Sequence, residues 1–125
     1  MQRILAVDDD KDILEVLEFI LEDSGYNVRT LSEGRNLLAE IKNYDPDLIL
    51  LDVMLGGLDG RELCREIKTN AETRHIPVIL FSAGHNIARL IHQQFAPNAF
   101  LEKPFDISTL LDAVRSNMPS GLKVG

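Results

Sequence analysis

The sequence predicts a single α/β domain: a doubly wound parallel sheet of five strands flanked by five helices. Short apolar runs of strand length alternate along the chain with longer segments in which apolar residues recur at helical spacing. In addition, 125 residues are enough for one domain with a core and too few for two. We therefore expect residues 1–118 to form the domain and residues 119–125 to form a flexible tail.

The first three elements follow from apolar patterning and one glycine. Residues 4–7 are a continuous apolar run, which suits a strand buried on both faces. Apolar positions then recur at helical spacing from Ile13 as far as Ser24, and Gly25 supplies a stop signal. Residues 28–31 are short and partly β-branched, which predicts an edge strand.

The middle of the chain contains a second helix and the strongest strand prediction. Apolar positions 37, 38 and 41 mark the helix, and the turn pair Asp45-Pro46 ends it. Residues 47–52, DLILLD, are an apolar run with an acid at each end, which predicts a buried strand. After a loop with three glycines, Leu63 and Ile67 share one face of a third helix.

The last third of the chain repeats this alternation. We expect strands at 77–82 and 99–103, a fourth helix at 86–94 and a last helix at 107–118. Strands and helices spaced in this way indicate parallel βαβ units. In the flavodoxin-like strand order 2-1-3-4-5, which we expect here, ligands bind at the carboxyl ends of the strands.

Four predicted strands end in polar or charged side chains that suit one chemistry. Aspartates 8–10 follow the first strand, Asp52 ends the third, Ser82 the fourth and Lys103 the fifth. In the expected order Asp52 lies centrally, with the other acids and Ser82 one strand away on either side, at about 4.8 Å per strand. A lysine side chain can largely span the remaining gap. These groups are therefore expected to converge on one crevice.

Converging carboxylates need a counter-charge, and Mg²⁺, which takes oxygen ligands and retains water, is the natural partner. Asp52 would keep one oxygen free to attack a phosphoryl group, whose charge the metal and Lys103 would stabilise, while Ser82 donates a hydrogen bond. Without metal, at least one of Asp8, Asp9 and Asp52 is expected to have a raised pKa, because neighbouring anions disfavour full ionisation.

The segments ILAVDDD, DLILLDVML…LDG, VILFSA and FLEKPF, in this order, resemble a response-regulator receiver domain of bacterial two-component signalling. The resemblance covers residues 3–118. It implies that Asp52 is the phosphorylated residue and that Asp9 binds Mg²⁺ directly. It also implies that Asp8 acts mainly through a bound water and that the main-chain carbonyl of Met54 completes the protein's metal ligands.

The same resemblance implies roles for residues at the ends of the last two strands. Lys103 would hold the phosphoryl group, with a cis bond between Lys103 and Pro104. Ser82 would be the hydroxyl of a switch, and Phe100 the aromatic side chain that moves inward when Ser82 turns to the phosphate.

The chain departs from the family pattern at two places. Gly56 stands where the family commonly has proline, which predicts a more mobile loop. Met54 and Gly84, each two residues beyond a site residue, cannot position a water through a polar side chain. We therefore predict slow self-dephosphorylation, which the decay of the phosphorylated form would measure; loss within seconds would contradict it.

Simpler interpretations explain single residues but not the set. Asp10 or Asp9 could cap a helix, Lys103 could be a solvated surface lysine, and Phe100 could be a core residue.

Three other classes of protein fit the sequence less well. A flavodoxin-type domain would have a phosphate loop rich in serine, threonine and glycine where this chain has three aspartates. An aspartate-nucleophile phosphohydrolase would carry a second acid where Met54 stands. A degenerate receiver that acts only in protein contacts would not need the intact acids, hydroxyl and lysine.

Composition limits the remaining function classes. A net charge of −7 argues against direct nucleic-acid binding, and the single Cys64 excludes an internal disulfide. The sequence contains no apolar run of about 18 residues, so no membrane span is predicted. Asp8 falls where the apolar centre of a signal peptide would lie, which argues against a signal peptide. We expect a cytoplasmic, phosphorylation-controlled signalling switch rather than a turnover enzyme.

The expected partners follow from that function. A sensor histidine kinase or a phosphotransfer protein would donate the phosphoryl group. A downstream effector or a second copy of the chain would bind the face formed by the predicted helix 86–94, strand 99–103 and helix 107–118.

Overall fold

The computed structural model describes residues 1–83 and 96–119, in which five parallel strands form one sheet in the order β2-β1-β3-β6-β7. A separate antiparallel pair of two-residue strands, β4 and β5, follows β3. The strands are β1 Arg3–Val7, β2 Asn27–Leu31, β3 Leu48–Asp52, β4 Met54–Leu55, β5 Leu58–Asp59, β6 Val78–Ala83 and β7 Ala99–Lys103. The described helices are α1 Lys11–Asp23, α2 Leu37–Tyr44, α3 Gly60–Thr69 and α4 Ile107–Asn117.

The predicted flavodoxin-like, five-stranded parallel sheet is confirmed, and the details differ from the prediction. The sequence pattern did not reveal the β4–β5 pair. Because these two short strands precede them in the chain, the strands predicted as fourth and fifth are numbered β6 and β7. Four helices stand among the described residues, where five were predicted. The predicted helix 86–94 and residues 120–125 of the predicted tail lie outside the described part of the chain.

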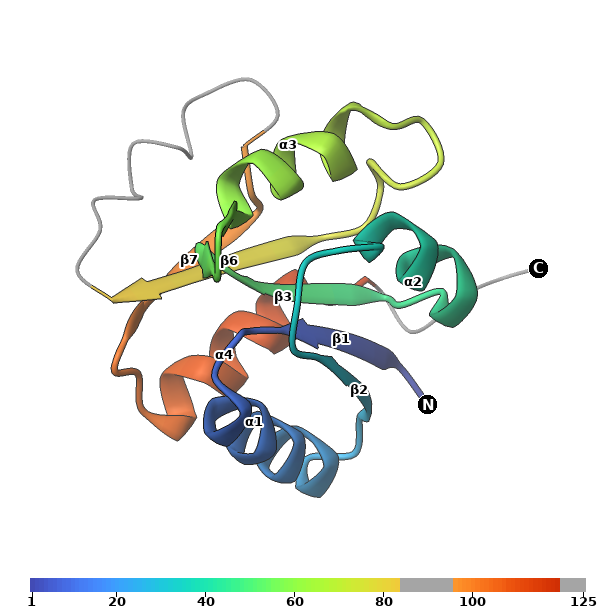
Figure 1. Ribbon diagram of the computed structural model, residues 1–125. Coiled ribbons are helices and arrows are strands. Elements are labelled where there is room, and N and C mark those ends of the chain that lie inside the picture. The colour runs from blue at the N-terminus through green and yellow to red at the C-terminus, as the bar shows by residue number, and fades with distance from the viewer. Residues whose placement is uncertain (84–95, 120–125) are drawn as a thin grey trace.

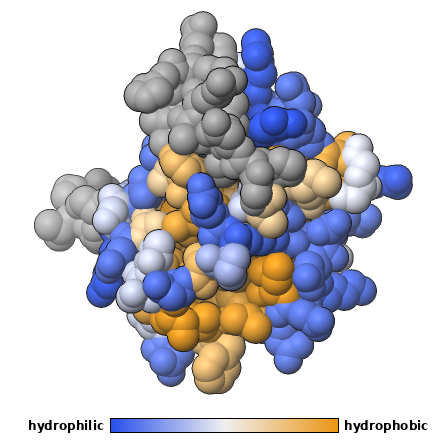
Figure 2. Space-filling view, turned by 90° about the vertical axis from the view of Figure 1, so that its left-hand side faces the viewer, coloured by the Kyte–Doolittle hydropathy of each residue, from blue (hydrophilic) through white to orange (hydrophobic). Residues whose placement is uncertain are grey.

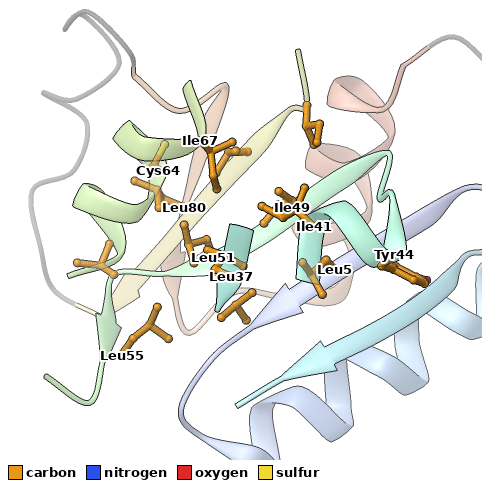
Figure 3. Close-up of a cluster of buried hydrophobic side chains, with 14 residues drawn as sticks. Leu5, Leu37, Ile41, Tyr44, Ile49, Leu51, Leu55, Cys64, Ile67 and Leu80 are labelled. Carbon is orange, nitrogen blue, oxygen red and sulfur yellow. The ribbon is translucent and has the colours of Figure 1, made fainter. Parts of the chain in front are cut away.

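The sheet separates two hydrophobic cores. Helices α1 and α4 cover one face of the sheet, and α2 and α3 cover the other (Figure 1). Figure 3 shows the core between the sheet and helices α2 and α3, where Leu5, Ile49 and Leu51 of the sheet face Ile41 of α2 and Ile67 of α3. Every residue of β3 is buried, as expected for a central strand packed against helices on both sides. No helix within the described ranges is both long and apolar enough to cross a membrane.

The acids after β1 begin helix α1 and explain where it starts. The Asp10 side chain accepts hydrogen bonds from the backbone N–H groups of Asp12 and Ile13, at 3.0 and 3.4 Å. This N-cap satisfies donors that have no partner within the helix. At the other end, Ser24 is the C-cap and Gly25 has a φ of +97°, which glycine adopts without strain.

A tight hairpin follows the carboxyl end of β3. Residues Met54 and Asp59 pair, as do Leu55 and Leu58, so that Gly56 and Gly57 alone make the turn. Their φ angles are +50° and +100°, the left-handed values that a two-residue hairpin turn requires. The glycine pair therefore permits a closed turn at this position. The greater mobility predicted for this loop stays a prediction.

Candidate functional site

Three carboxylates meet at the carboxyl edge of the sheet. Asp8 follows β1, Asp9 is its neighbour in the chain, and Asp52 ends the adjacent strand β3. One oxygen of each carboxylate lies within 4.8 Å of one oxygen of the other two. Asp8 and Asp52 are buried, whereas Asp9 is exposed to solvent. We call Asp8, Asp9 and Asp52 the acidic cluster.

The three consecutive aspartates have different environments. Asp8 is fully buried, and its Oδ1 accepts a hydrogen bond from the backbone N–H of Asp10 at 2.9 Å. Asp10 turns its own side chain to the α1 N-terminus and caps the helix. The capping interpretation is therefore correct for Asp10. It does not explain the burial of Asp8 or the position of Asp9 in the acidic cluster.

Lys103 brings a positive charge into the acidic cluster from the end of β7. Its Nζ donates to Oδ2 of Asp8 at 2.8 Å and lies 3.5 Å from Oδ2 of Asp52. Only 17% of the lysine side chain is exposed. The Lys103-Pro104 peptide bond is cis, as the family resemblance implied. The expectation that a lysine two strands from Asp52 reaches the acids is confirmed.

The surroundings of Asp52 raise its pKa and so make its ionisation less favourable than that of an ordinary aspartate. The pKa of Asp52 is raised to about 6, with burial as the largest cause and the negative charge of Asp8 as the next. The Lys103 ammonium and a hydrogen bond from the Met54 backbone N–H oppose the shift. A raised pKa of at least one acid was predicted from neighbouring anions; Asp52 has such a pKa, but burial raises it more than the charge of Asp8 does. At neutral pH Asp52 is still mostly ionised.

The donors of the acidic cluster fit a hard divalent cation. Each acid offers carboxylate oxygen, the ligand type that Mg²⁺ and Ca²⁺ prefer. With all three acids ionised, one ammonium among three carboxylates leaves a formal charge of minus two. Asp9, the exposed member, is open to an ion arriving from solvent. Charge and ligand chemistry therefore both match a dication.

Ser82 and Phe100 lie on β6 and β7, near the same edge. Ser82 follows Phe81, the residue that pairs with Asp52 across the two strands. The Ser82 hydroxyl is buried and has no hydrogen-bond partner among the described residues, which is costly for a buried polar group. Phe100 is half-buried against the core under α2 and α3. Its expected movement with Ser82 stays a prediction.

The residues two positions beyond Asp52 and Ser82 differ in what the structure says of them. Met54 is 60% exposed, and its backbone N–H donates a hydrogen bond to the Asp52 side chain. The predicted role of its carbonyl as a metal ligand remains untested. Gly84, which the dephosphorylation prediction also used, lies outside the described residues.

Gly60, the first residue of α3, is a site-supporting residue that the sequence pattern did not reveal. A Cβ placed there would lie 2.0 Å from the main-chain oxygen of Asp52 and 2.9 Å from Cα of Val53. The Gly60 N–H donates to the Val53 carbonyl at 2.8 Å. Only glycine allows the helix to approach the Asp52 backbone this closely. A glycine at the first helical position, where better helix formers exist, was the available signal.

An apolar groove of about 400 Å³ adjoins the acidic cluster, and Lys103 lines it. Its other lining residues come from α1, the end of β6 and the segment after β7: Asp12, Ile13, Val16, Leu17, Ala83, Pro104 and Phe105. Figure 2 looks onto this edge of the molecule and shows apolar side chains gathered in its lower part, on the side where α1 and α4 lie. Val16 is 55% exposed there.

Comparison with known proteins agrees with this geometry. The family model described as "Response regulator receiver domain" matches residues 4–115. A putative response regulator from Chloroflexus aurantiacus J-10-fl is similar in structure, with a TM-score of 0.83 and 33% identity over 92% of this chain and 95% of that one.

Two further structures show the same relationship. The signal receiver domain of a signal transduction histidine kinase from Syntrophus aciditrophicus has a TM-score of 0.87 and 29% identity, covering 100% of this chain and 96% of that one. Chemotaxis protein CheY4 of Vibrio cholerae has a TM-score of 0.84 and 26% identity, covering 94% and 99%. With its parallel sheet, its edge of clustered acids and this match along most of its length, the chain belongs to the response regulator receiver domain family.

Proposed function

We propose that the chain is a phosphorylation-controlled signalling switch that accepts a phosphoryl group on Asp52 in a Mg²⁺-dependent reaction. One observation supports this more than any other. Asp52 is buried beside two further carboxylates and only one ammonium, an excess of negative charge that is unfavourable unless the site binds a cation, and that cation could in turn hold a phosphoryl group. The phosphohydrolase and flavodoxin-type alternatives have no comparable support.

In the proposed reaction a carboxylate oxygen of Asp52 attacks the phosphorus atom of a phosphohistidine. The P–O bond forms as the P–N bond breaks, and the electron pair of that bond returns to the imidazole nitrogen of the donor. Asp52 must be ionised to attack, and a pKa of about 6 leaves it so at neutral pH. Lys103 would stabilise the charge on the phosphoryl oxygens, and Ser82 would donate its unpaired hydroxyl hydrogen to one of them.

The metal would be held by Asp9, Asp52 and the Met54 main-chain carbonyl, with Asp8 acting mainly through water. Bound there, Mg²⁺ supplies positive charge opposite the phosphoryl oxygens. Asp8 already shares its Oδ2 with Lys103, which supports an indirect role for this carboxylate.

Receiver domains are regulatory domains rather than turnover enzymes. The proposed phosphoryl-aspartate would be long-lived, because the exposed Met54 side chain offers no group to position an attacking water. Slow loss of the phosphoryl group suits a switch that reports an upstream signal for some time.

Receiver domains interact with histidine kinases and effector domains. For this chain we propose that the phosphodonor is a sensor histidine kinase or a phosphotransfer protein. Because Lys103 lines both the acidic cluster and the apolar groove, a donor protein that reaches Asp52 would also cover the groove. Phosphorylation adds close to two negative charges at Asp52.

The output surface is proposed as the face of the predicted helix 86–94, β7 and α4, of which β7 and α4 are described. Phe100 and Lys103, both on β7, would link that face to Asp52. An effector or a second copy of the chain would bind there. A coupling free energy of a few kcal/mol between phosphorylation and partner binding would be enough for a switch.

The test is incubation with acetyl phosphate and Mg²⁺, followed by intact-mass measurement and mapping of the modified residue. We expect a gain of one phosphoryl group on Asp52, dependent on metal and lost in chelator. Asp52→Asn should accept none, whereas Glu62→Gln, at an exposed acid outside the acidic cluster, should react like the wild type. Modification at another residue, or no mass gain at any metal concentration, would refute the proposal.

A further inference from the structure

Phe81 of β6 is fully buried and yet touches the charged part of the site. It pairs with Asp52 on one side and with Leu101 of β7 on the other, so it lies between the strands that supply the acid and the lysine. The Lys103 Nζ lies over the Phe81 ring, 4.9 Å from its centroid. This distance and placement are those of a cation–π contact.

The Phe81 ring and two carboxylates together surround the Lys103 ammonium. The ammonium donates to Asp8 at 2.8 Å and lies 3.5 Å from Asp52, and the Phe81 ring lies beneath it. A lysine has a flexible four-carbon stem, so these contacts decide where its charge is placed. With 17% of the side chain exposed, water shields the contact only partly.

A second aromatic ring packs against Phe81. Phe105, in the segment after β7, meets Phe81 edge to face, with centroids 6.1 Å apart and an interplanar angle of 85°. This geometry is favourable for two aromatic rings. In this arrangement the electron-rich face of the Phe81 ring is directed at the Lys103 ammonium.

We propose that Phe81 is a positioning residue for phosphorylation: its ring face keeps the Lys103 ammonium beside Asp52, where the incoming phosphoryl oxygens need it. This inference rests on the proposed function. A leucine or valine would fill the same place in an apolar strand and pack in the same core. Neither has the negative ring face that attracts a cation, so the role belongs to the aromatic ring and not to hydrophobicity alone.

The first measurement examines the contact without any phosphorylation. Protons of the Lys103 ε-methylene, next to an ammonium that lies over the ring face, should resonate upfield in the NMR spectrum of the wild-type protein. Phe81→Leu should return them to ordinary lysine positions. Ile79→Val, which trims the same core two residues away, should leave them in place. An unchanged lysine shift in Phe81→Leu would show that the ring does not hold the ammonium.

The second measurement tests the role in the reaction. Site-specific replacement of Phe81 by mono-, di- and trifluorophenylalanine withdraws electrons from the ring face and changes its shape little. We expect the rate of phosphorylation by acetyl phosphate to fall stepwise with each fluorine, by about three- to thirtyfold over the series, the span of a cation–π contact. The same replacements at Phe19, an exposed residue of α1, should leave the rate unchanged.

The outcomes separate this inference from the proposed function. If the wild-type chain accepts phosphate and all fluorinated forms react at one rate, the proposed role of Phe81 is wrong and the proposed function stands. If the wild-type chain accepts no phosphate, the proposed function fails and the role of Phe81 in the reaction fails with it. Since the fluorinated rings keep the shape of phenylalanine, the series remains informative even if Phe81→Leu unfolds.

Discussion

At the residue scale, the acidic cluster makes Asp52 a source of instability in the metal-free protein. Its pKa is about 6 in the folded state, against an ordinary value of 3.8. Between these values the folded state binds more protons than the unfolded chain, so the free energy of unfolding falls as the pH rises. Above about pH 7 the destabilisation is complete, and a shift of this size corresponds to about 3 kcal/mol at most.

Asp52→Asn should therefore stabilise the metal-free protein. The amide keeps the size of the side chain and removes the charge that burial and Asp8 oppose. In chelator above about pH 7, we expect the free energy of unfolding to rise by about 1–3 kcal/mol, measured by urea denaturation. Asp59→Asn, at a partly exposed acid of the β4–β5 hairpin that caps α3 and pairs with Arg61, should not stabilise the protein. An unchanged or less stable Asp52→Asn protein would contradict the crowding argument.

The pH dependence provides an independent check with the same pair of proteins. The stability advantage of Asp52→Asn over the wild type should be largest above about pH 7 and shrink as the pH falls from about 6 to about 4, because protonation of Asp52 in the folded wild type removes the same charge. Urea denaturation of both proteins across this range, in chelator, measures the difference. A constant difference would show that the carboxylate charge is not the cause.

At the scale of elements, the sequence predicted those features that leave a pattern over several residues. The runs 4–7 and 47–52 became β1 and β3, since a strand covered by helices on both faces must be apolar throughout. Gly25 and the pair Asp45-Pro46 mark the observed ends of α1 and α2. The convergence of Lys103 with the acids followed from strand order alone.

The missed features depend on contacts between segments or on very short elements. Two-residue strands such as β4 and β5 are too short to show periodicity, so MLGGLDG looked like a plain loop. Phe81 looks like any other residue of an apolar strand, and only the folded chain places Lys103 over its ring. The need for glycine at position 60 arises from the Asp52 carbonyl, which is eight residues away in sequence.

Gly60→Ala should disrupt the junction of β3, the hairpin and α3. The added Cβ would lie 2.0 Å from the Asp52 main-chain oxygen, so backbone must move, and we expect a loss of about 2 kcal/mol or more of stability. The movement would displace Asp52 itself. Thermal denaturation with and without Mg²⁺ should therefore show both a lower Tm and a smaller stabilisation by the metal.

Gly25→Ala is a matched control for that variant. Gly25 has a φ of +97°, with no other atom within 4 Å of an added Cβ, and lies at the far end of α1 from the acidic cluster. It should lose about 1 kcal/mol through backbone strain and keep the full response to Mg²⁺. If both variants respond equally to the metal, Gly60 does not position Asp52.

At the scale of the whole molecule, charge is distributed unevenly and favours cation binding. The chain carries a net charge of −7, and three of its acids share one edge of the sheet with a single ammonium. A bound dication would relieve the repulsion at that edge in the folded protein. The unfolded chain, which does not hold the three carboxylates together, would gain less, so binding must stabilise the fold.

Millimolar Mg²⁺ should accordingly raise the Tm of the wild-type protein. At a free metal concentration of a hundred times the dissociation constant, linkage gives about 2.7 kcal/mol of added stability. Part of any salt effect would come from screening of the net charge, so NaCl at equal ionic strength is the reference. Asp9→Asn removes the solvent-exposed ligand and should abolish most of the excess effect of Mg²⁺, whereas Glu62→Gln should retain it. If Mg²⁺ and NaCl at equal ionic strength shift the wild-type Tm alike, the acidic cluster does not bind the metal.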